Sequence, residues 1–246
     1  MKVELINYQQ NALEILLLTK STRLKGETLE GIMVMSMNEK LAHFEYMKDT
    51  IKSSFEFCTY IFGISGVSRA FTQQFERTRT QSYAEQSLRS VDVGDAKVYN
   101  FGLCNDYDFA AVNSLTAYKT MIDSGVPIQD ARGILPLNIT TNIMVATNLR
   151  TLHETAKVRL CFRTQGEYQE VFKKMKECIR YVHPWAADML NVACVDSGIC
   201  CFPRYTECPI QASTVKVSVH QKLAIKILWE QTNHVANPIA KNGVTV

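Results

Sequence analysis

Apolar residues recur at helical spacing in several parts of the chain, so that one face of each segment is apolar. Residues 28–50 show this first, with charged residues between the apolar positions. Gly125 and Pro127 separate two later segments of the same kind, and Pro184 ends the last one. The predicted helices cover residues 28–50, 67–77, 108–123, 128–134, 148–159 and 166–182.

Two segments favour β-structure instead. Residues 55–64 are rich in aromatic and β-branched side chains, which predicts a buried strand that ends before Gly66. Residues 138–147 contain no aromatic residue but are rich in β-branched side chains, and they predict a second strand. Helices and strands alternate without an internal repeat or a clear linker, so we expect a mixed fold of the α+β (mixed α/β) class in a single domain over residues 1–246.

The C-terminal part of the chain has a different composition. Residues 192–210 are rich in Cys, Pro and Gly and predict a loop. A last strand is expected at 214–219 and a last helix at 221–233.

Composition excludes some classes of protein. Of the 246 residues 46% are hydrophobic, which is enough for a substantial core, and the net charge is only +3. A general nucleic-acid binder would carry a denser basic stripe, so we expect no nucleic-acid partner. The chain has no apolar run long enough to span a membrane, and residues 1–5 lack the apolar stretch of a signal peptide. We therefore expect a cytoplasmic protein without a membrane partner.

The eight cysteines include four between positions 194 and 208. Their spacing lacks a C-x2-C pair and matches no zinc template well. We expect reduced, structural thiols and no metal site, with a metal site or a local disulfide as the alternatives.

The segment 66–89 carries the most informative side chains. Arg77 and Arg79 are followed by the hydroxyls of Ser82 and Ser87 and then by Arg89. One guanidinium group can donate hydrogen bonds to two oxygens of the same phosphate, and short hydroxyl side chains can bind the oxygens that remain. From Arg77 on, these side chains lie at and beyond the C-terminal end of the helix predicted at 67–77, and the dipole at that end repels anions. We therefore expect phosphate to be bound here by side chains and loop amides.

Arg77-Thr78-Arg79, seven residues and then Ser87 resemble the signature of the flavin-dependent thymidylate synthases, which is Arg-His-Arg, seven residues and Ser. The resemblance continues in the same order over roughly residues 50–180. The other matching segments are 124–127, 131–132, 135–138, 147–150 and 159–161.

This resemblance implies a fold, cofactors and partners. The family's fold is a single domain with a central antiparallel-type sheet flanked by long helices. Its members are homotetramers with active sites between subunits. They bind FAD and dUMP, take a one-carbon unit from methylenetetrahydrofolate and use NADPH to reduce the flavin. Residues 190–246 lie outside the resemblance and form a C-terminal extension of unknown role.

The resemblance also assigns residues by position. The cofactor-binding positions are Ser53, Arg77, Thr78, Arg79, Glu85, Asn148, Leu149, Arg150 and Glu154. The substrate-binding positions are Gln74, Glu85, Gln86, Ser87, Leu88, Arg89, Arg132 and Arg159. Ser87 and Arg89 would bind the nucleotide phosphate. Arg159 is the expected catalytic residue, because a cation beside the pyrimidine favours ionisation at N3 and raises the electron density at carbon 5. No cysteine nucleophile is then needed, and we expect Cys161 to be structural.

The chain departs from the family pattern around the expected reaction chamber. Thr78, Ile51 and Phe57 stand where the family has His, and Glu154 stands where it has Asn. Ser90 replaces a Tyr and Gly166 a Trp, whereas Glu56 is retained. Phe57 could belong to the core, and Glu154 could be solvated or paired with Arg150 on the same helix face. The alternative is an altered reaction.

Three hypotheses from different classes follow. The first is a flavin- and folate-dependent enzyme acting at carbon 5 of a pyrimidine deoxynucleotide, most simply by methylation of dUMP. A dUMP or dCMP hydroxymethylase is its variant. The second is a nucleotide-binding relative without catalysis. The third is an RNA- or DNA-binding module that uses the Arg-rich segment electrostatically.

Overall fold

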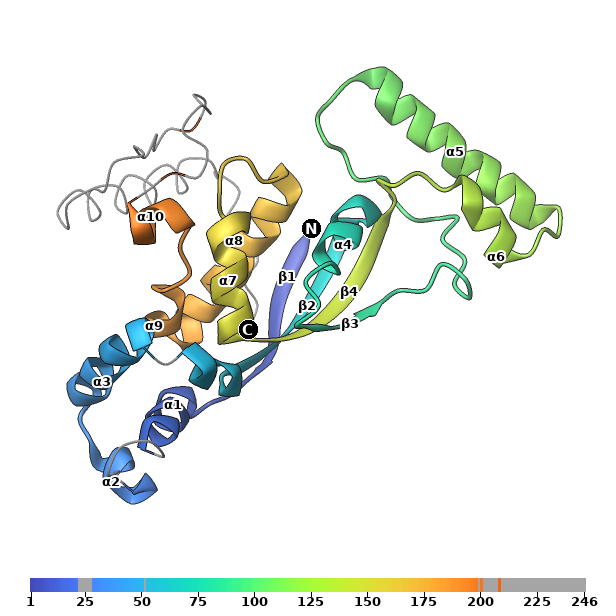
Figure 1. The fold of residues 1–246 in the computed structure, drawn as a ribbon. Helices are drawn as coiled ribbons and strands as arrows, with labels where there is room; N and C mark the ends of the chain where they lie inside the picture. The colour runs from blue at the N-terminus through green and yellow to red at the C-terminus, as the bar shows by residue number, and fades with distance from the viewer. Residues whose placement is uncertain (22–27, 51, 199, 201–207, 209–246) are drawn as a thin grey trace. The chain divides into compact units, whose positions relative to one another are not determined.

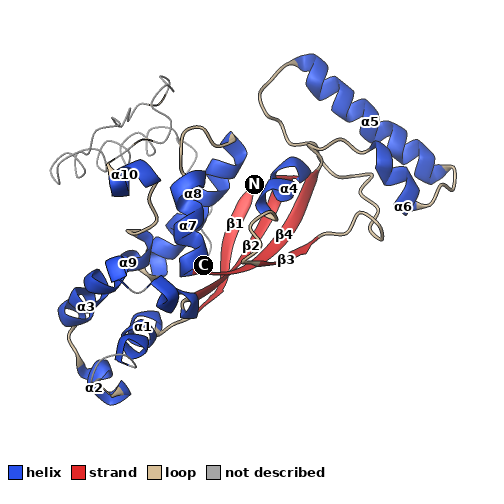
Figure 2. Cartoon of the chain, viewed as in Figure 1, coloured by secondary structure: helices blue, strands red, loops and turns tan. Residues whose placement is uncertain are grey.

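The computed structural model describes residues 1–21, 28–50, 52–198, 200 and 208. The chain alternates helices with the four strands of one sheet (Figures 1 and 2). The strands are β1 (Lys2–Tyr8), β2 (Thr59–Ser68), β3 (Ser82–Glu85) and β4 (Thr140–Asn148). The first helices are α1 (Ala12–Ser21), α2 (Leu29–Val34), α3 (Met37–Thr50), the 3₁₀ helix η1 (Lys52–Phe57) and α4 (Arg69–Phe75). The later ones are α5 (Asn105–Asp123), α6 (Ile128–Ala131), η2 (Arg132–Ile134), α7 (Leu149–Arg159), α8 (Gly166–Val182), α9 (Pro184–Ala187) and α10 (Ala193–Ser197).

The sheet has the order β1-β2-β4-β3, with β3 at an edge. β3 pairs antiparallel with β4, and Ser82 faces Ala146 at one end of the ladder while Glu85 faces Ile143 at the other. Along β4 the buried residues Ile143 and Val145 alternate with exposed ones, as expected for a strand with one covered face. The predicted class, a mixed fold with an antiparallel-type sheet and long helices, is confirmed.

The chain divides into two compact units, which are described separately. One unit is Met1–Val3 with Ile61–Ala146, and the other is Glu4–Tyr60 with Thr147–Val246. In the first, Val93, Tyr118, Ala131 and Ile139 form a buried cluster against which Leu88 and Leu115 pack. In the second, aromatic rings form much of the core. Its buried aromatic residues include Phe44, Phe55, Tyr168 and Phe172. That the whole of 1–246 is one domain stays a prediction.

The predicted helix at 28–50 is wrong in one respect, because the structure divides it into α2 and α3. Met35 has an extended backbone (ψ 143°), which ends α2. Ser36 and Glu39 then begin α3 with reciprocal bonds. The Glu39 carboxylate accepts from the Ser36 amide (2.8 Å), and the Ser36 hydroxyl accepts from the Glu39 amide (3.3 Å). This capping box starts a new helix inside a continuous apolar pattern.

The predicted strand at 55–64 is also misplaced. Residues up to Phe57 belong to the helix η1, and the strand β2 runs from Thr59 to Ser68. Phe57 is 59% exposed, so the interpretation of this residue as core is wrong. Gly66 lies inside the strand and not after it, at a φ of +66° that favours glycine.

Other differences concern short elements. β1, α1 and β3 had no counterpart in the predicted elements, and α10 lies inside the predicted loop 192–210. The predicted strand at 214–219 and helix at 221–233 lie outside the described residues. In the part of the chain that the structure describes, no helix is both long enough and apolar enough to cross a membrane.

Candidate functional site

The Arg77-Thr78-Arg79 segment forms the turn between α4 and β3. Ser68 begins α4, its hydroxyl accepting from the Phe71 amide (3.0 Å). At the other end of the helix the Thr78 amide donates to the Phe75 carbonyl oxygen (3.2 Å). The turn is therefore an extension of the last turn of α4.

Tyr83, which the sequence analysis did not assign to the site, contacts this turn. Its hydroxyl lies 2.7 Å from the Phe75 carbonyl oxygen and 3.1 Å from that of Thr78. Its ring packs edge-on against Phe75, with the centroids 5.3 Å apart. Tyr83 thus connects β3 to the segment that carries the two signature arginines.

The signature guanidinium groups are available for a ligand. Arg77, Arg79 and Arg89 are all exposed. Among the described residues none of their side chains makes an ion pair or a hydrogen bond. Exposed cations that the protein itself does not neutralise are suited to bind phosphate oxygens.

The segment that follows β3 is held in place from both sides. The Gln86 amide donates to the Asn142 carbonyl oxygen (2.9 Å), and the Asn142 side-chain amide donates to Gln86 Oε1 (3.1 Å). The Ser87 hydroxyl accepts from the Arg89 amide (3.1 Å), while Leu88 packs on the buried cluster around Tyr118. Ser87 and Arg89 are therefore presented to solvent on a fixed backbone.

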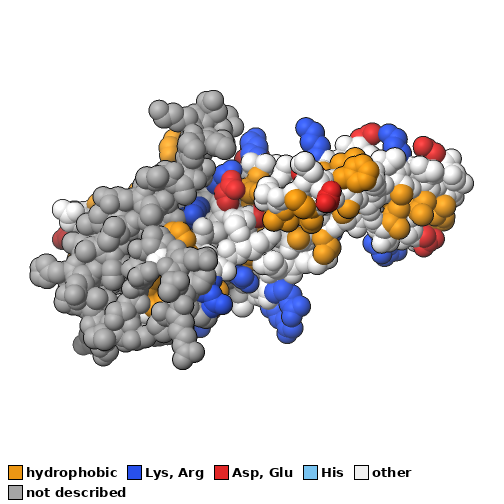
Figure 3. Space-filling view, turned by 90° about the horizontal axis from the view of Figure 1, so that it is seen from above, with side chains coloured by type: hydrophobic (Ala, Val, Ile, Leu, Met, Phe, Trp, Pro, Cys, Tyr) orange, Lys and Arg blue, Asp and Glu red, His pale blue; other side chains and the backbone are white. Residues whose placement is uncertain are grey.

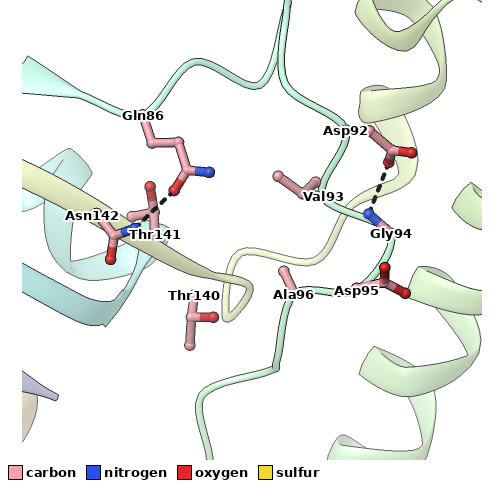
Figure 4. A pocket seen from close by; sticks show the side chains of 9 residues that line it. All are labelled: Gln86, Asp92, Val93, Gly94, Asp95, Ala96, Thr140, Thr141 and Asn142. Atoms are coloured by element: carbon pink, nitrogen blue, oxygen red, sulfur yellow. Dashed lines mark hydrogen bonds between the residues drawn. The ribbon is translucent and has the colours of Figure 1, made fainter.

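A polar cavity of about 500 Å³ lies beside Gln86 (Figure 4). Its walls come from β4, from Gln86 and from the loop 92–96. Within that loop, Asp92 Oδ1 accepts from the Gly94 amide (2.9 Å), which keeps the wall in shape. Gln86, one of the predicted substrate-binding residues, lines this cavity.

Other predicted substrate positions in this unit, Gln74, Arg132 and Glu85, do not line the cavity. Gln74 lies half-buried near the end of α4. Arg132 begins η2, is exposed and donates from Nε to the Gln129 carbonyl oxygen (3.1 Å). Glu85 is bound by Arg69, a residue that the sequence analysis did not select, at 2.5 Å.

The second group of predicted residues lies in the other unit, on α7 and η1. The Asn148 side chain caps α7 by accepting from the Thr151 amide (2.9 Å). Leu149 is fully buried, and its amide donates to the Cys58 carbonyl oxygen (2.8 Å). Arg150 and Ser53 are exposed.

The suggested pair of Arg150 with Glu154 is wrong. Arg150 pairs with Glu56 (2.5 Å), the acidic residue retained from the family pattern. Glu154 instead accepts from Lys157 at 2.8 and 2.9 Å. Burial works to raise the pKa of the Glu154 carboxyl, but the hydrogen bond from Lys157 and the charges of Lys157 and Lys52 hold it below its usual value. Glu154 is therefore ionised at neutral pH and neutralised locally.

Arg159 is positioned by an aromatic ring. Its guanidinium carbon lies 4.3 Å from the centroid of the Tyr168 ring, which is fully buried on α8. A cation over an aromatic face is attracted by the ring quadrupole. The sequence placed Arg159 in the site but did not indicate Tyr168 as its support.

Three of the described cysteines, Cys58, Cys178 and Cys194, are buried. Burial, together with the neighbouring thiols of Cys200, Cys208 and Cys161, raises the pKa of Cys194 to about 12, so this thiol stays protonated. Among the described residues no group of His, Cys, Asp and Glu side chains is arranged to hold a metal ion.

Comparison with known proteins decides the family. Residues 4–185 match the profile of the thymidylate synthase complementing proteins. The flavin-dependent thymidylate synthase of Pyrococcus furiosus is 31% identical over 218 residues, which cover 81% of this chain and 88% of the relative. The chain belongs to the flavin-dependent thymidylate synthase family. The enzyme hypothesis is therefore favoured over a nucleic-acid-binding module.

Solved structures share this family fold. Thymidylate synthase X from Helicobacter pylori, crystallised with FAD and dUMP, matches with a TM-score of 0.66 at 17% identity, over 77% of this chain and 99% of that one. The UMP/dUMP methylase PolB from Streptomyces cacaoi, bound to 5-Br dUMP, matches with a TM-score of 0.66 at 18% identity, over 76% and 93%. At these identities the likeness shows the fold.

Proposed function

We propose that this protein uses FAD to transfer a one-carbon unit from methylenetetrahydrofolate to carbon 5 of a pyrimidine deoxynucleotide, with NADPH as the reductant. The simplest reaction is the conversion of dUMP to dTMP. The names of its relatives and the FAD and dUMP bound in a similar structure support this. The family tetramer and one catalytic domain, with residues 190–246 as a C-terminal extension of unknown role, belong to the same proposal.

The observation that carries the proposal is the set of three exposed guanidinium groups, on Arg77, Arg79 and Arg89, which no described residue neutralises. Two of them lie in the turn before β3 and one follows the strand. A flavin dinucleotide and a nucleotide each carry phosphate charge that needs such partners. The residues present therefore fit both ligands.

Each group of residues then has a role. The family resemblance assigns FAD-binding positions in each unit: Arg77, Thr78, Arg79 and Glu85 in the first, and Ser53, Asn148, Leu149, Arg150 and Glu154 in the second. Ser87 and Arg89 bind the nucleotide 5′-phosphate. The remaining nucleotide contacts are Gln74, Glu85, Gln86, Leu88 and Arg132.

Arg159 activates the pyrimidine. Tyr168 holds its guanidinium in one orientation, so the charge is in place before the ring anion develops. A fixed cation beside N3 stabilises that anion and raises the electron density at carbon 5. When bound, FAD supplies the redox chemistry, and the chain's own residues supply orientation and charge.

FAD binding is the first test. Titration of the purified protein is expected to show FAD binding at micromolar concentrations, and Arg79→Ala should weaken it roughly ten-fold or more, because a hydrogen bond to a charged group contributes about 1.5–3 kcal/mol. Arg180→Ala, which removes an arginine paired with Asp188, is the matched control and should bind FAD as the wild type does. Absence of FAD binding by the wild type would contradict the proposal.

The phosphate position is tested with dUMP against deoxyuridine. The wild type should bind dUMP far more tightly, and Arg89→Ala should remove most of that difference. Lys97→Ala, an exposed cation of the same unit, is the control. If Arg89→Ala prefers dUMP to deoxyuridine by the same ratio of affinities as the wild type, the phosphate is bound elsewhere.

The substitutions at family positions of the expected reaction chamber support a second candidate, hydroxymethylation of dUMP or dCMP. Phe57 reaches solvent where the family has His, and Glu154 adds a carboxylate. Products from dUMP and dCMP with FAD, NADPH and methylenetetrahydrofolate are identified by mass. A product heavier by a hydroxymethyl group, or any product from dCMP, supports this candidate, whereas thymidylate alone supports the first. Ligand binding without any product would indicate a non-catalytic relative.

Glu154→Asn separates a base-reading role from a local one. Because Lys157 already neutralises Glu154, Lys157→Met is the matched variant that frees the carboxylate. If Glu154 reads the base, Glu154→Asn shifts the preference toward dUMP and Lys157→Met shifts it toward dCMP. Unchanged preference in both variants would leave Glu154 as a partner of Lys157 only.

A further inference from the structure

We propose that Arg69 is a positioning residue for the nucleotide site, because it holds Glu85 and the start of the segment 86–89 in their binding geometry. The inference rests on the proposed function of that segment. Arg69 itself lies outside the signature and has none of the family roles assigned above.

Arg69 joins two elements through one guanidinium group. It is the first residue of α4, and its amide donates to the Ile139 carbonyl oxygen (3.1 Å). Nη1 donates to Glu85 Oε2 at 2.5 Å, and Nη2 donates to the Gln86 carbonyl oxygen. The two nitrogens thus bind the side chain of the last residue of β3 and the backbone of the next residue.

The place of this contact in the fold explains why it matters. β3 has only four residues and lies at the edge of the sheet, so its end is held by β4 on one side alone. Directly after it, the backbone turns away to present Ser87 and Arg89. Arg69 secures that point from the helix side, and a lysine could not bind both acceptors with one planar fork.

Arg69 also places a positive charge beside the Glu85 carboxylate. The side chains of Arg69 and Glu85 are 17% and 14% exposed. Burial raises the pKa of the Glu85 carboxyl above its usual value. The Thr72 side chain and then the charge of Arg69 work to lower it, and the charge of Glu76 raises it. The Thr72 hydroxyl donates to the Arg69 carbonyl oxygen (3.1 Å). Glu85 Oε1 is buried without a hydrogen-bond partner among the described residues, so Arg69 is the cation that this carboxylate contacts.

Without Arg69, the Glu85 carboxylate would lose the cation that it contacts. Glu85 is the last residue of β3, directly before the segment that carries the expected phosphate position. At high pH it would be charged and would repel the phosphate and disturb the turn. At low pH it would be protonated, and the repulsion would disappear. Loss of Arg69 should therefore weaken nucleotide binding in a way that depends on pH.

The test compares dUMP affinity of wild type, Arg69→Met and the double variant Arg69→Met/Glu85→Gln between pH 6 and pH 9. Arg69→Met should bind dUMP roughly ten-fold or more weakly at pH 9, with part of the loss recovered at pH 6. The double variant lacks the carboxylate and should follow the pH dependence of the wild type. Lys119→Met, which removes an exposed ion pair with Asp95 in the same unit, is the control.

Two results would overturn the inference while leaving the proposed function intact. One is wild-type affinity in Arg69→Met at every pH. The other is an equal loss at every pH, which indicates a structural role only. If Arg69→Met does not fold, Arg69→Lys replaces it. The lysine keeps a positive charge beside Glu85 but loses the planar fork, so it should raise the KM for dUMP and leave kcat close to the wild-type value, and an unchanged KM would overturn the inference. Failure of the wild type to bind dUMP would overturn both proposals.

Discussion

At the scale of single residues, the functional side chains are oriented by partners that lie far away in the sequence or on a neighbouring element. Arg159 is held by Tyr168 of α8, and Arg150 by Glu56 of η1. The Arg150–Glu56 pair is about half exposed, so it contributes little to stability, but it fixes the direction of the guanidinium. Orientation is thus the main contribution of these contacts.

Arg159→Lys should lower kcat more than it weakens dUMP binding. Lysine keeps the charge but loses the planar group that stacks on Tyr168. Because the charge acts mainly on the developing ring anion, we expect a loss of roughly ten-fold or more in kcat with a smaller change in affinity. Steady-state kinetics and direct dUMP titration measure the two quantities, and Arg180→Lys is the control. Equal losses in both would make Arg159 a binding residue only.

His153, next to Glu154 on α7, should make the protein less stable in acid. Burial first, and then the charge of Lys157, lower the pKa of His153 to about 4, from an unfolded value near 6.5. Between pH 6.5 and pH 4, His153 is protonated in the unfolded state but stays neutral in the folded state. The free energy of unfolding therefore falls from pH 6.5 to pH 4, by up to about 1.4 kcal/mol per pH unit.

His153→Gln should remove that part of the slope. Denaturant unfolding of both proteins from pH 7.5 to pH 4 measures it, and the difference between the two curves isolates His153. Burial also lowers the pKa of His183, but that residue is present in both proteins and cancels. Parallel curves over the whole range would show that His153 does not titrate in this way.

At the scale of elements, the signature turn is shaped by the contact between α4 and β3. The Tyr83 hydroxyl of β3 lies within hydrogen-bond distance of the carbonyl oxygen of Phe75, the last residue of α4, and of that of Thr78 in the turn. Arg69 at the start of α4 binds the end of β3. The helix and the strand therefore determine each other's ends. The arginines of the turn occupy defined positions as a result.

Tyr83→Phe should weaken FAD binding without unfolding the protein. The ring contact with Phe75 remains, but the hydroxyl no longer fixes the turn. A net hydrogen bond contributes about 1 kcal/mol, so roughly a five-fold loss of affinity is expected. Tyr46→Phe, at an exposed tyrosine, is the control in the same titration. Wild-type affinity in Tyr83→Phe would show that the turn does not depend on this hydroxyl.

At the scale of the whole molecule, apolar side chains reach the surface around α5. Leu103 is 67% exposed, Phe109 68% and Val112 49%. Figure 3 shows hydrophobic side chains at the surface of this part of the chain. Exposed apolar patches indicate protein–protein contacts, which supports the proposed tetramer.

Phe109→Asp should shift the protein toward smaller assemblies. If Phe109 is buried between subunits, its loss weakens that interface by about 1.5–3 kcal/mol, and burying a carboxylate in its place weakens it further. Sedimentation velocity over a range of concentrations measures the change, and Thr116→Asp, at an exposed polar position of the same helix, is the control. A monomeric wild type, or a variant that assembles like the wild type, would contradict the subunit contact.

The sequence by itself determined the long helices and the family. The helix predicted at 166–182 has the bounds of α8, because its strong 3.6-residue periodicity requires one apolar face. The signature arginines and the segments matching the family were also readable in order. Their roles in binding stay predictions.

Only the tertiary structure decided how these parts meet. The apolar pattern continues through Met35 and Phe57, but a capping box divides one helix and η1 leaves Phe57 exposed. β3 is too short for a pattern and exists because β4 pairs with it. Arg150 pairs with Glu56, 94 residues away, and not with Glu154 on its own helix, because partner choice depends on distance in space. Periodicity shows which face is buried, whereas packing selects what it is buried against.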